Sequence, residues 1–192
     1  MAPGPSPEAA YAPEERARLR DIAAASIRHG LTQGAPLAVG LGTLPAKLRE
    51  PRATFVTLER SGRLRGCIGT LEARRPLAQD VADQAYAAAF RDPRFVPLEA
   101  GELPDLELKI SVLSPPEALS AEAARALPDT LRPGIDGLII EDGPHRATFL
   151  PSVWAQLPDP QDFVAALRQK AGLPPAGSNP NLRAFRYTTE EF

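Results

Sequence analysis

The segment that constrains the fold most strongly is ATFVTLERSGRLRGCIGT, residues 53–70, in which two β-prone runs flank a serine and a glycine. The pair Ser61-Gly62 suits a two-residue turn, because glycine readily takes the positive φ that such turns require. The segment therefore predicts a β-hairpin with antiparallel strands. With a two-residue turn, Val56 lies opposite Cys67, and the two side chains share a face of the sheet.

The rest of the chain predicts further helices and strands. Residues 106–113, LELKISVL, alternate apolar and polar side chains as a half-buried strand does. The order hairpin, helix, strand occurs twice, which favours an α+β fold with a mixed, largely antiparallel sheet and packed helices over a doubly wound parallel sheet. The other predicted elements are a helix from Pro13 to about His29 with Gly30 as its stop, a connection at 33–52, a helix that begins at Pro76, a second hairpin at 134–151 with Asp142-Gly143 in its turn, a helix capped by Asp159, and a final strand within 181–192.

Composition and the N-terminal segment give expectations about organisation. We expect residues 1–12, rich in Pro, Ala and Gly, to form a disordered tail, and residues 13–192 to form a single domain with two lobes. The first residues, MAPGPSPEAA, do not have the basic and then apolar pattern of a secretory signal. No apolar run approaches the roughly 20 residues that span a bilayer. We therefore expect a cytoplasmic protein without a membrane partner, and the sequence does not predict its oligomeric state.

Charge is unevenly distributed along the chain. The formal net charge of −2 argues against general binding of nucleic acid. Within residues 47–75, however, eight lysines and arginines stand against three glutamates. This segment is either a solvated hairpin with arginines at its rim or a surface that attracts a small anionic ligand to the region of Cys67.

Cys67 is the only cysteine, so no internal disulfide can form. It is either a small residue that packs between strand and helix or a reactive thiol. Arg65 nearby would lower the pKa of the thiol, whereas burial would raise it. A nucleophilic cysteine usually has a base beside it, and the two histidines, His29 and His145, fall in a helix end and a hairpin turn. Glycines at 66 and 69 indicate a bulge or the close approach of a ligand or of backbone.

Other charged residues have a structural and a functional interpretation each. Asp92 and Arg94 in FRDPRF form either a local salt bridge or part of a site. Asp136, Glu141 and Asp142 either solvate the second hairpin or include a functional carboxylate. We find no metal-ligand spacing, no P-loop and no dinucleotide fingerprint, and we therefore predict no metal site and no cofactor.

Six stretches carry a resemblance to a known family. In chain order they are LRGCIGTL, AAFRDPRFVPL, LPDLELKISVLSP, RPGIDGLIIEDG, RATFLPSVW and LRQKAGL. Together they resemble the AMMECR-one domain family over roughly residues 15–190, and in particular its bacterial stand-alone members, called AmmeMemoRadiSam system protein A. LRGCIG is the most specific of these motifs.

The resemblance implies a compact α+β fold of two unequal lobes, with the cysteine motif near a cleft between them. It also implies partners, since bacterial members are associated with a Memo-like protein, similar to class III extradiol dioxygenases, and with a radical SAM protein. Where some members have a histidine before the glycine of the second hairpin, this chain has Asp136, which removes the most obvious histidine partner for a Cys–His mechanism. The site residues implied are Cys67 as the catalytic candidate and, as residues lining the cleft, Arg65, Gly66, Ile68, Gly69, Thr70, Asp92, Arg94, Phe95, Thr148 and Pro151.

Two functional hypotheses follow. In the first, the protein is an enzyme or small-molecule-binding protein, with Cys67 as nucleophile or ligand contact, Arg65 as the nearby charge, and Gly66 and Gly69 leaving space for substrate. In the second, it is a non-catalytic interaction module for the Memo-like and radical SAM partners, and the motif is structural. The family resemblance favours the first slightly.

Overall fold

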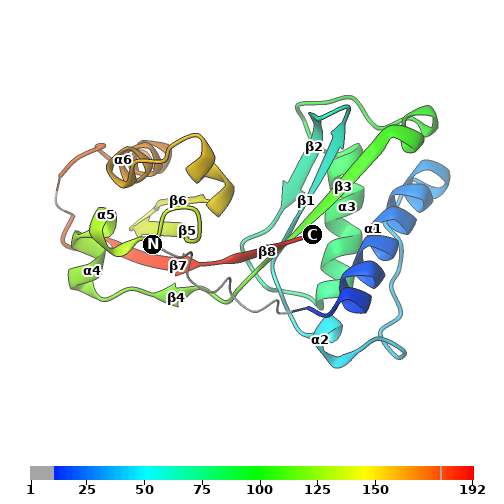
Figure 1. Cartoon of the computed structure of the whole chain (residues 1–192), viewed down its shortest axis with the longest axis horizontal. Coiled ribbons are helices and arrows are strands. Elements are labelled where there is room, and N and C mark those ends of the chain that lie inside the picture. Colours follow the sequence, from blue (N-terminus) through cyan, green and yellow to red (C-terminus); the bar gives the residue numbers. More distant parts are fainter. Residues whose placement is uncertain (1–10, 178) are drawn as a thin grey trace, which may run out of the picture. The chain divides into compact units, whose positions relative to one another are not determined.

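The computed structural model describes residues 11–177 and 179–192, and the chain forms two compact units (Figure 1). Unit 1 runs to Leu113 and takes up the chain again at Glu190–Phe192, whereas unit 2 is Ser114–Thr189. Both units combine helices with a four-stranded antiparallel sheet, so the α+β prediction is confirmed. The prediction that one domain spans both units stays a prediction.

The sheet of unit 1 has the strand order β2-β1-β3-β8, which leaves β2 at one edge. The strand predicted at 106–113 is confirmed with the same bounds. The elements of this unit are α1 (Pro13–Gln33), α2 (Ala46–Arg49), β1 (Thr54–Arg60), β2 (Arg63–Gly69), α3 (Leu77–Phe90), a 3-10 helix η1 (Ala100–Asp105), β3 (Leu106–Leu113) and β8 (Thr189–Glu191).

Helices α1 and α3 lie side by side on one face of this sheet (Figure 1). Their apolar stripes pack on the even-numbered residues of β1 and β3, because alternate side chains of a strand point to the same face. Val56, Leu58 and Ile110 are fully buried there. The opposite face of the sheet carries the odd-numbered residues, among them Thr57 and Lys109, which lie opposite each other.

The first hairpin contains a β-bulge that changes the predicted register. Near the turn, Arg60 pairs with Arg63, as a two-residue turn requires, and Ser61 and Gly62 both have positive φ. Beyond it, Leu58 pairs with Gly66, so that Arg65 is an extra residue. The bulge shifts the rest of β2 by one residue. The predicted pair Val56–Cys67 is therefore wrong, and Cys67 lies opposite Thr57.

The first helix is longer than predicted. It does not stop at Gly30 but continues to Gln33, and Gly34 in the left-handed conformation ends it. Gly30 serves close packing instead: a Cβ atom there would lie 2.4 Å from the ring of Phe90 and 2.7 Å from the ring of Tyr86. Glycine at this position lets α1 approach α3.

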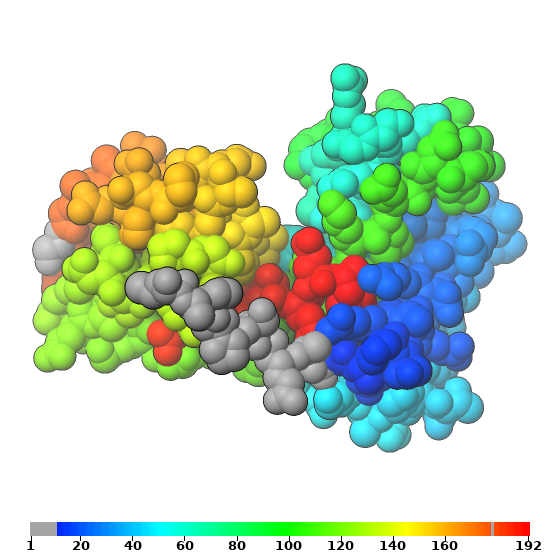
Figure 2. Space-filling view, viewed as in Figure 1, coloured from blue at the N-terminus to red at the C-terminus, as the bar shows by residue number. Residues whose placement is uncertain are grey.

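The two ends of the described chain meet in unit 1. Residues 1–10, most of the predicted tail, lie outside the described residues, whereas Tyr11 is 6% exposed and belongs to the core. The backbone N–H of Tyr11 donates to Glu190, and Phe192 exchanges two backbone hydrogen bonds with Ile110. The space-filling view shows the red C-terminal residues against the blue start of α1 (Figure 2).

Unit 2 has its own sheet, with the order β4-β7-β5-β6, and its own core. Trp154 stacks on Phe163 at a ring-centroid distance of 3.8 Å, and the indole N–H donates to the carbonyl of Asp136. Asp159 caps the last helix as predicted. The elements are β4 (Glu117–Ala118), α4 (Ala121–Arg125), α5 (Leu127–Thr130), β5 (Gly137–Asp142), β6 (His145–Phe149), a 3-10 helix η2 (Pro151–Ala155), α6 (Pro160–Lys170) and β7 (Arg183–Tyr187).

The final strand predicted within 181–192 is in fact two strands. β7 ends at Tyr187 and belongs to the sheet of unit 2, whereas β8 belongs to the sheet of unit 1. The segment 181–192 therefore contributes one strand to each sheet, and the alternation of its apolar residues does not show where the first strand ends.

Candidate functional site

Cys67 lies in the edge strand β2 and is a partly buried residue with a free thiol. The hydroxyl of Thr57 donates a hydrogen bond to Sγ at 3.2 Å. Opposite residues approach most closely in pairs that do not exchange backbone hydrogen bonds, which explains this side-chain contact. The N–H and C=O of Cys67 therefore point away from β1, toward the open edge of the sheet.

Asp92 and Arg94 occupy that open edge. The carboxylate of Asp92 accepts the backbone N–H of Cys67 at 2.9 Å, and Nη2 of Arg94 donates to the carbonyl of Cys67 at 3.1 Å. The two side chains also bind each other, with Nη2 of Arg94 2.7 Å from the carboxylate. Together they satisfy the backbone of Cys67 as a neighbouring strand would. We call this pair the edge brace.

The edge brace is electrostatically tight. The side chain of Asp92 is only 2% exposed, and Arg94 together with the backbone N–H groups of Cys67 and Arg94 holds the pKa of its carboxyl well below the usual range. Asp92 likewise raises the pKa of Arg94. The salt-bridge interpretation of Asp92 and Arg94 is thus confirmed, and the pair also contacts the cysteine motif directly.

Gly66 and Gly69 are required for packing. A Cβ atom at Gly66 would lie 2.1 Å from the carbonyl oxygen of Ala88, so β2 approaches the backbone of α3 more closely than any side chain permits. At Gly69 a Cβ atom would lie 2.3 Å from the ring of Phe55. The two glycines accommodate protein atoms, and neither leaves the space for substrate that the first hypothesis assigned to it.

Arg65, the extra residue of the bulge, is paired with a carboxylate that the sequence did not indicate. Its Nε and Nη2 donate to the two oxygens of Glu102 at 2.8 and 2.9 Å. Arg65 and the backbone N–H of Glu99 lower the pKa of Glu102 to about 2. The third nitrogen, Nη1, is buried and has no hydrogen-bond partner among the residues that the structure describes.

Phe95 lies near two guanidinium groups. The Cζ atom of Arg65 is 6.0 Å from the centre of the ring, and that of Arg94 is 5.5 Å from it. Both distances are within the range of cation–π attraction. The ring thereby connects the edge brace to Arg65.

No base contacts the thiol of Cys67 in the described part of the chain. Nδ1 of His29 is hydrogen-bonded to the carbonyl of Ala35, and Nδ1 of His145 to that of Ala171. Arg65 and Arg94 are each paired with a carboxylate, which reduces the field that either exerts on the sulfur.

The remaining predicted site residues differ in their roles. Ile68 packs against the core of unit 1, and the N–H of Thr70 donates to the carbonyl of Thr54. Thr148 and Pro151 lie in unit 2, at the end of β6 and at the start of η2. The structure thus brings Arg65, Cys67, Asp92, Arg94 and Phe95 together within unit 1.

The hydroxyl of Thr148 donates to the carbonyl of Leu138 at 2.9 Å. The same hydroxyl lies 3.0 Å from the phenol oxygen of Tyr187. Burial raises the pKa of Tyr187 to about 12, so its phenol stays protonated. Asp136 is fully buried and is paired with Arg132, which gives this aspartate a structural role in the loop before β5.

Two residues at the site were not indicated by the sequence analysis. Thr57 contacts the thiol only because of the bulge, and a one-residue slip in register is not encoded by alternation. Glu102 is 37 residues from Arg65. The one signal for it is a glutamate three residues after Glu99, the spacing of a capping box, and the two do form one.

Among the described residues, no group of three or more His, Cys, Asp and Glu side chains has a geometry suited to a metal ion. A search of the same residues for a helix with the length and apolar character needed to cross a membrane found none.

The AMMECR1 family, called the AMMECR-one family above, matches residues 20–192. The chain therefore belongs to the AMMECR1 family.

Relatives of the chain occur in archaea. A protein of Methanothermobacter thermautotrophicus is 42% identical over 153 residues, which cover 78% of this chain and 79% of that one. A protein of Thermofilum pendens is 37% identical over 164 residues, covering 77% and 75%. Among solved structures, the uncharacterized protein PH0010 of Pyrococcus horikoshii matches with a TM-score of 0.81 and 32% identity, over 93% of this chain and 90% of that one.

Proposed function

We propose that the protein binds a small anionic ligand next to the bulge of β2, through Arg65, with Phe95 and Cys67 as neighbouring contacts. The observation that carries the proposal is the buried Nη1 of Arg65, which has no hydrogen-bond partner among the described residues. A buried donor on a charged group is costly when it is left unpaired, so an acceptor from a ligand would gain the full energy of a charge-assisted bond.

The surroundings of Arg65 support an anion with a flat or apolar part. Phe95 offers a ring beside Arg65 and Arg94, and the exposed side chain of Arg63 adds positive charge to the same strand. Glu102 neutralises Arg65 only on the side of Nε and Nη2. A carboxylate or phosphate oxygen, the usual acceptor for arginine, would bond to Nη1 when the side chains that bury it move aside.

Cys67 acts in this proposal as a contact rather than as a nucleophile. Nucleophilic thiols need a base or an unpaired cation beside them; among the described residues no base contacts this thiol, and Arg65 and Arg94 are each paired with a carboxylate. Alkylation of native Cys67 by iodoacetamide is therefore expected to be slow at pH 7. Fast alkylation, with a midpoint below the roughly 8.5 of a free thiol, would favour the enzyme hypothesis instead.

The test compares Arg65→Lys with Arg63→Lys. Lysine at 65 can keep an ion pair with Glu102 but has no group in the place of Nη1, whereas Arg63 is exposed and serves as a matched control on the same strand. We expect inorganic phosphate or succinate at millimolar concentration to raise the unfolding temperature of the wild type and of Arg63→Lys. Arg65→Lys should not respond. Equal responses of the two variants, or no response of the wild type to either anion, would refute ligand binding here.

The second candidate function is an interaction module for a Memo-like protein and a radical SAM protein. It is favoured by two exposed apolar side chains on the two motifs: Leu64 on β2 is 44% exposed and Val96, directly after DPRF, is 76% exposed. A double variant, Leu64→Ser with Val96→Ser, should then abolish binding to the purified partner, whereas Cys67→Ala should retain it. Purified proteins that never associate would exclude this function.

A cytoplasmic location stays a prediction.

A further inference from the structure

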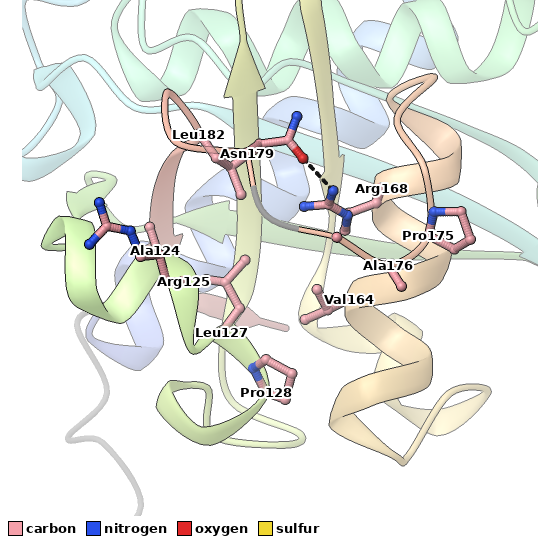
Figure 3. Close-up of a pocket in the computed structure, with 11 residues that line it drawn as sticks. Ala124, Arg125, Leu127, Pro128, Val164, Arg168, Pro175, Ala176, Asn179 and Leu182 are labelled. Atoms are coloured by element: carbon pink, nitrogen blue, oxygen red, sulfur yellow. Dashed lines mark hydrogen bonds between the residues drawn. The ribbon is translucent and has the colours of Figure 1, made fainter.

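Unit 2 contains a pocket of about 280 Å³ between α4–α5 on one side and α6 with the following loop on the other (Figure 3). Its volume is just below the roughly 300–1,000 Å³ of small-molecule sites, which suits a small ligand. Leu127 and Val164 face each other across its apolar part, and Arg168 and Asn179 stand above them. No residue of the cysteine motif or of the edge brace lines it, although Arg168 belongs to LRQKAGL, one of the six stretches that carry the family resemblance.

Arg168 is the feature of this pocket that needs an explanation. The residue is 5% exposed, and its guanidinium reaches from α6 toward the α4–α5 side. Its Nε donates to the carbonyl of Pro174 and its Nη2 to the side-chain oxygen of Asn179. Both acceptors are neutral. Within the described part of the chain, no carboxylate forms an ion pair with Arg168, and Nη1 makes no hydrogen bond there.

A buried cation without a paired anion is unusual, because removing a charge from water costs several kcal/mol unless an opposite charge compensates it. The other arginine at the rim, Arg125, is exposed and makes no ion pair with any described residue. No described lining residue is acidic. One acid acts indirectly, since Asp142 accepts a hydrogen bond from the amide nitrogen of Asn179 and so orients the oxygen of Asn179 toward Arg168.

We propose that this pocket is a binding site for a small molecule with an anionic head, a phosphate or carboxylate, on an apolar body. The head lies on the free Nη1 of Arg168, and the body lies between Leu127, Val164 and Ala176. Arg125 adds to the positive potential at the entrance. The site is independent of the ligand site proposed beside Arg65.

The fixed guanidinium explains why an anion is selected. Asn179 and Pro174 hold Arg168 in one orientation, so little side-chain entropy is lost when an oxygen binds to Nη1. The apolar floor excludes water from one side of the ion pair and strengthens it. A neutral molecule of the same shape would leave Nη1 and the charge uncompensated.

The experiment titrates the full chain with phenyl phosphate, benzoate, inorganic phosphate and benzyl alcohol, by calorimetry and by the backbone amide NMR signals of Leu127, Val164 and Ala176. We expect phenyl phosphate or benzoate to bind and to shift these signals. Which of the two binds more tightly shows whether the site prefers a phosphate or a carboxylate head. Benzyl alcohol should not bind, and inorganic phosphate should bind more weakly than phenyl phosphate. Failure of both aromatic anions to bind, or equal binding of benzyl alcohol, would overturn the proposal.

Variants locate the binding. Arg168→Lys should weaken the best probe about tenfold or more, because lysine cannot keep both neutral acceptors and also present a free N–H at the same place. If Arg168→Lys fails to fold, Ala176→Trp fills the pocket from an exposed loop residue and should also abolish binding. Arg125→Glu should weaken binding about threefold, whereas Arg28→Glu, an exposed arginine of α1, should not.

Arg65→Lys separates the two sites. It should leave the titration of the pocket unchanged, so loss of one site does not imply loss of the other. Unchanged binding in both Arg125→Glu and Ala176→Trp would overturn the proposal.

Discussion

Each unit contains an aspartate–arginine pair with a buried carboxylate and a half-exposed guanidinium. In unit 1, Asp92 is 2% and Arg94 53% exposed; in unit 2, Asp136 is 0% and Arg132 54% exposed. The pairs differ in what else they bind. Each aspartate accepts the backbone N–H of its own partner arginine, but Asp92 also accepts the N–H of Cys67, 25 residues away.

This difference shows that similar ion pairs can have different structural roles. The edge brace connects the loop after α3 to an edge strand, so it determines the position of the cysteine motif. The pair in unit 2 closes its own loop before β5. The indole N–H of Trp154 donates to the backbone carbonyl of Asp136, and this bond does not involve the carboxylate. Removing Asp92 should therefore affect a distant strand, and removing the carboxylate of Asp136 should affect its own loop.

The largest expected effect is that of Asp92→Ala. It removes the acceptor of the N–H groups of Cys67 and Arg94 and of the Arg94 guanidinium, and at about 1 kcal/mol for each of these hydrogen bonds the loss is about 3 kcal/mol. Urea denaturation should show a loss of this size in the free energy of unfolding. Asp21→Asn, an exposed aspartate of α1, is the control. A loss below about 1 kcal/mol would mean that β2 does not depend on the edge brace.

The pH dependence of stability tests the ion pairs of unit 1 without removing a buried side chain. The pKa values of Asp92 and Glu102 are lower in the folded state, that of Glu102 about 2 against roughly 4.3 when unfolded. Both carboxylates therefore stabilise the fold fully above about pH 4–5, and this contribution is lost as the pH falls toward 2. Glu102→Gln should reduce the slope of stability against pH in this window. An unchanged slope would contradict the role of the Arg65–Glu102 pair.

Asp136→Asn should cost less, about 2 kcal/mol, because asparagine still accepts the N–H of Arg132 and leaves the carbonyl bond to Trp154 in place. The fluorescence of Trp154, the only tryptophan, should keep its native maximum. A cost equal to that of Asp92→Ala would show that the two pairs do not differ as we describe.

Arg94→Lys is expected to have the smallest effect, under about 1 kcal/mol. Lysine can keep the charge beside Asp92 but loses the second hydrogen bond to the carbonyl of Cys67, and the side chain is half exposed. Amide hydrogen exchange should nevertheless become faster along β2, with β5 as the internal control. Equal exchange in both strands would argue against a brace at the edge.

How far the sequence predicts the molecule depends on the range of the interaction. Turn residues and caps act locally, so Ser61-Gly62 and the Asp159 cap were predicted correctly. The bulge at Arg65 was not, because it depends on how β2 fits against the backbone of α3 at Ala88.

The candidate site follows the same rule. The residues implied by the family resemblance include both members of the edge brace, which no local pattern connects to Cys67. Thr57 and Glu102 were missed because one needs the true register and the other a contact across 37 residues. The pocket around Arg168 was missed as well, since an arginine on a predicted amphipathic helix gives no sign that it will be buried.

The position of β8 affects when the protein can complete its fold during synthesis. Unit 2 lies between β3 and β8 along the chain, so the outer edge of β3 stays unpaired while the residues of unit 2 are made. At about 5–20 residues per second, this exposure lasts several seconds on the ribosome. Unit 2 waits as long for its own sheet, because β7, an inner strand of that sheet, directly precedes β8 along the chain.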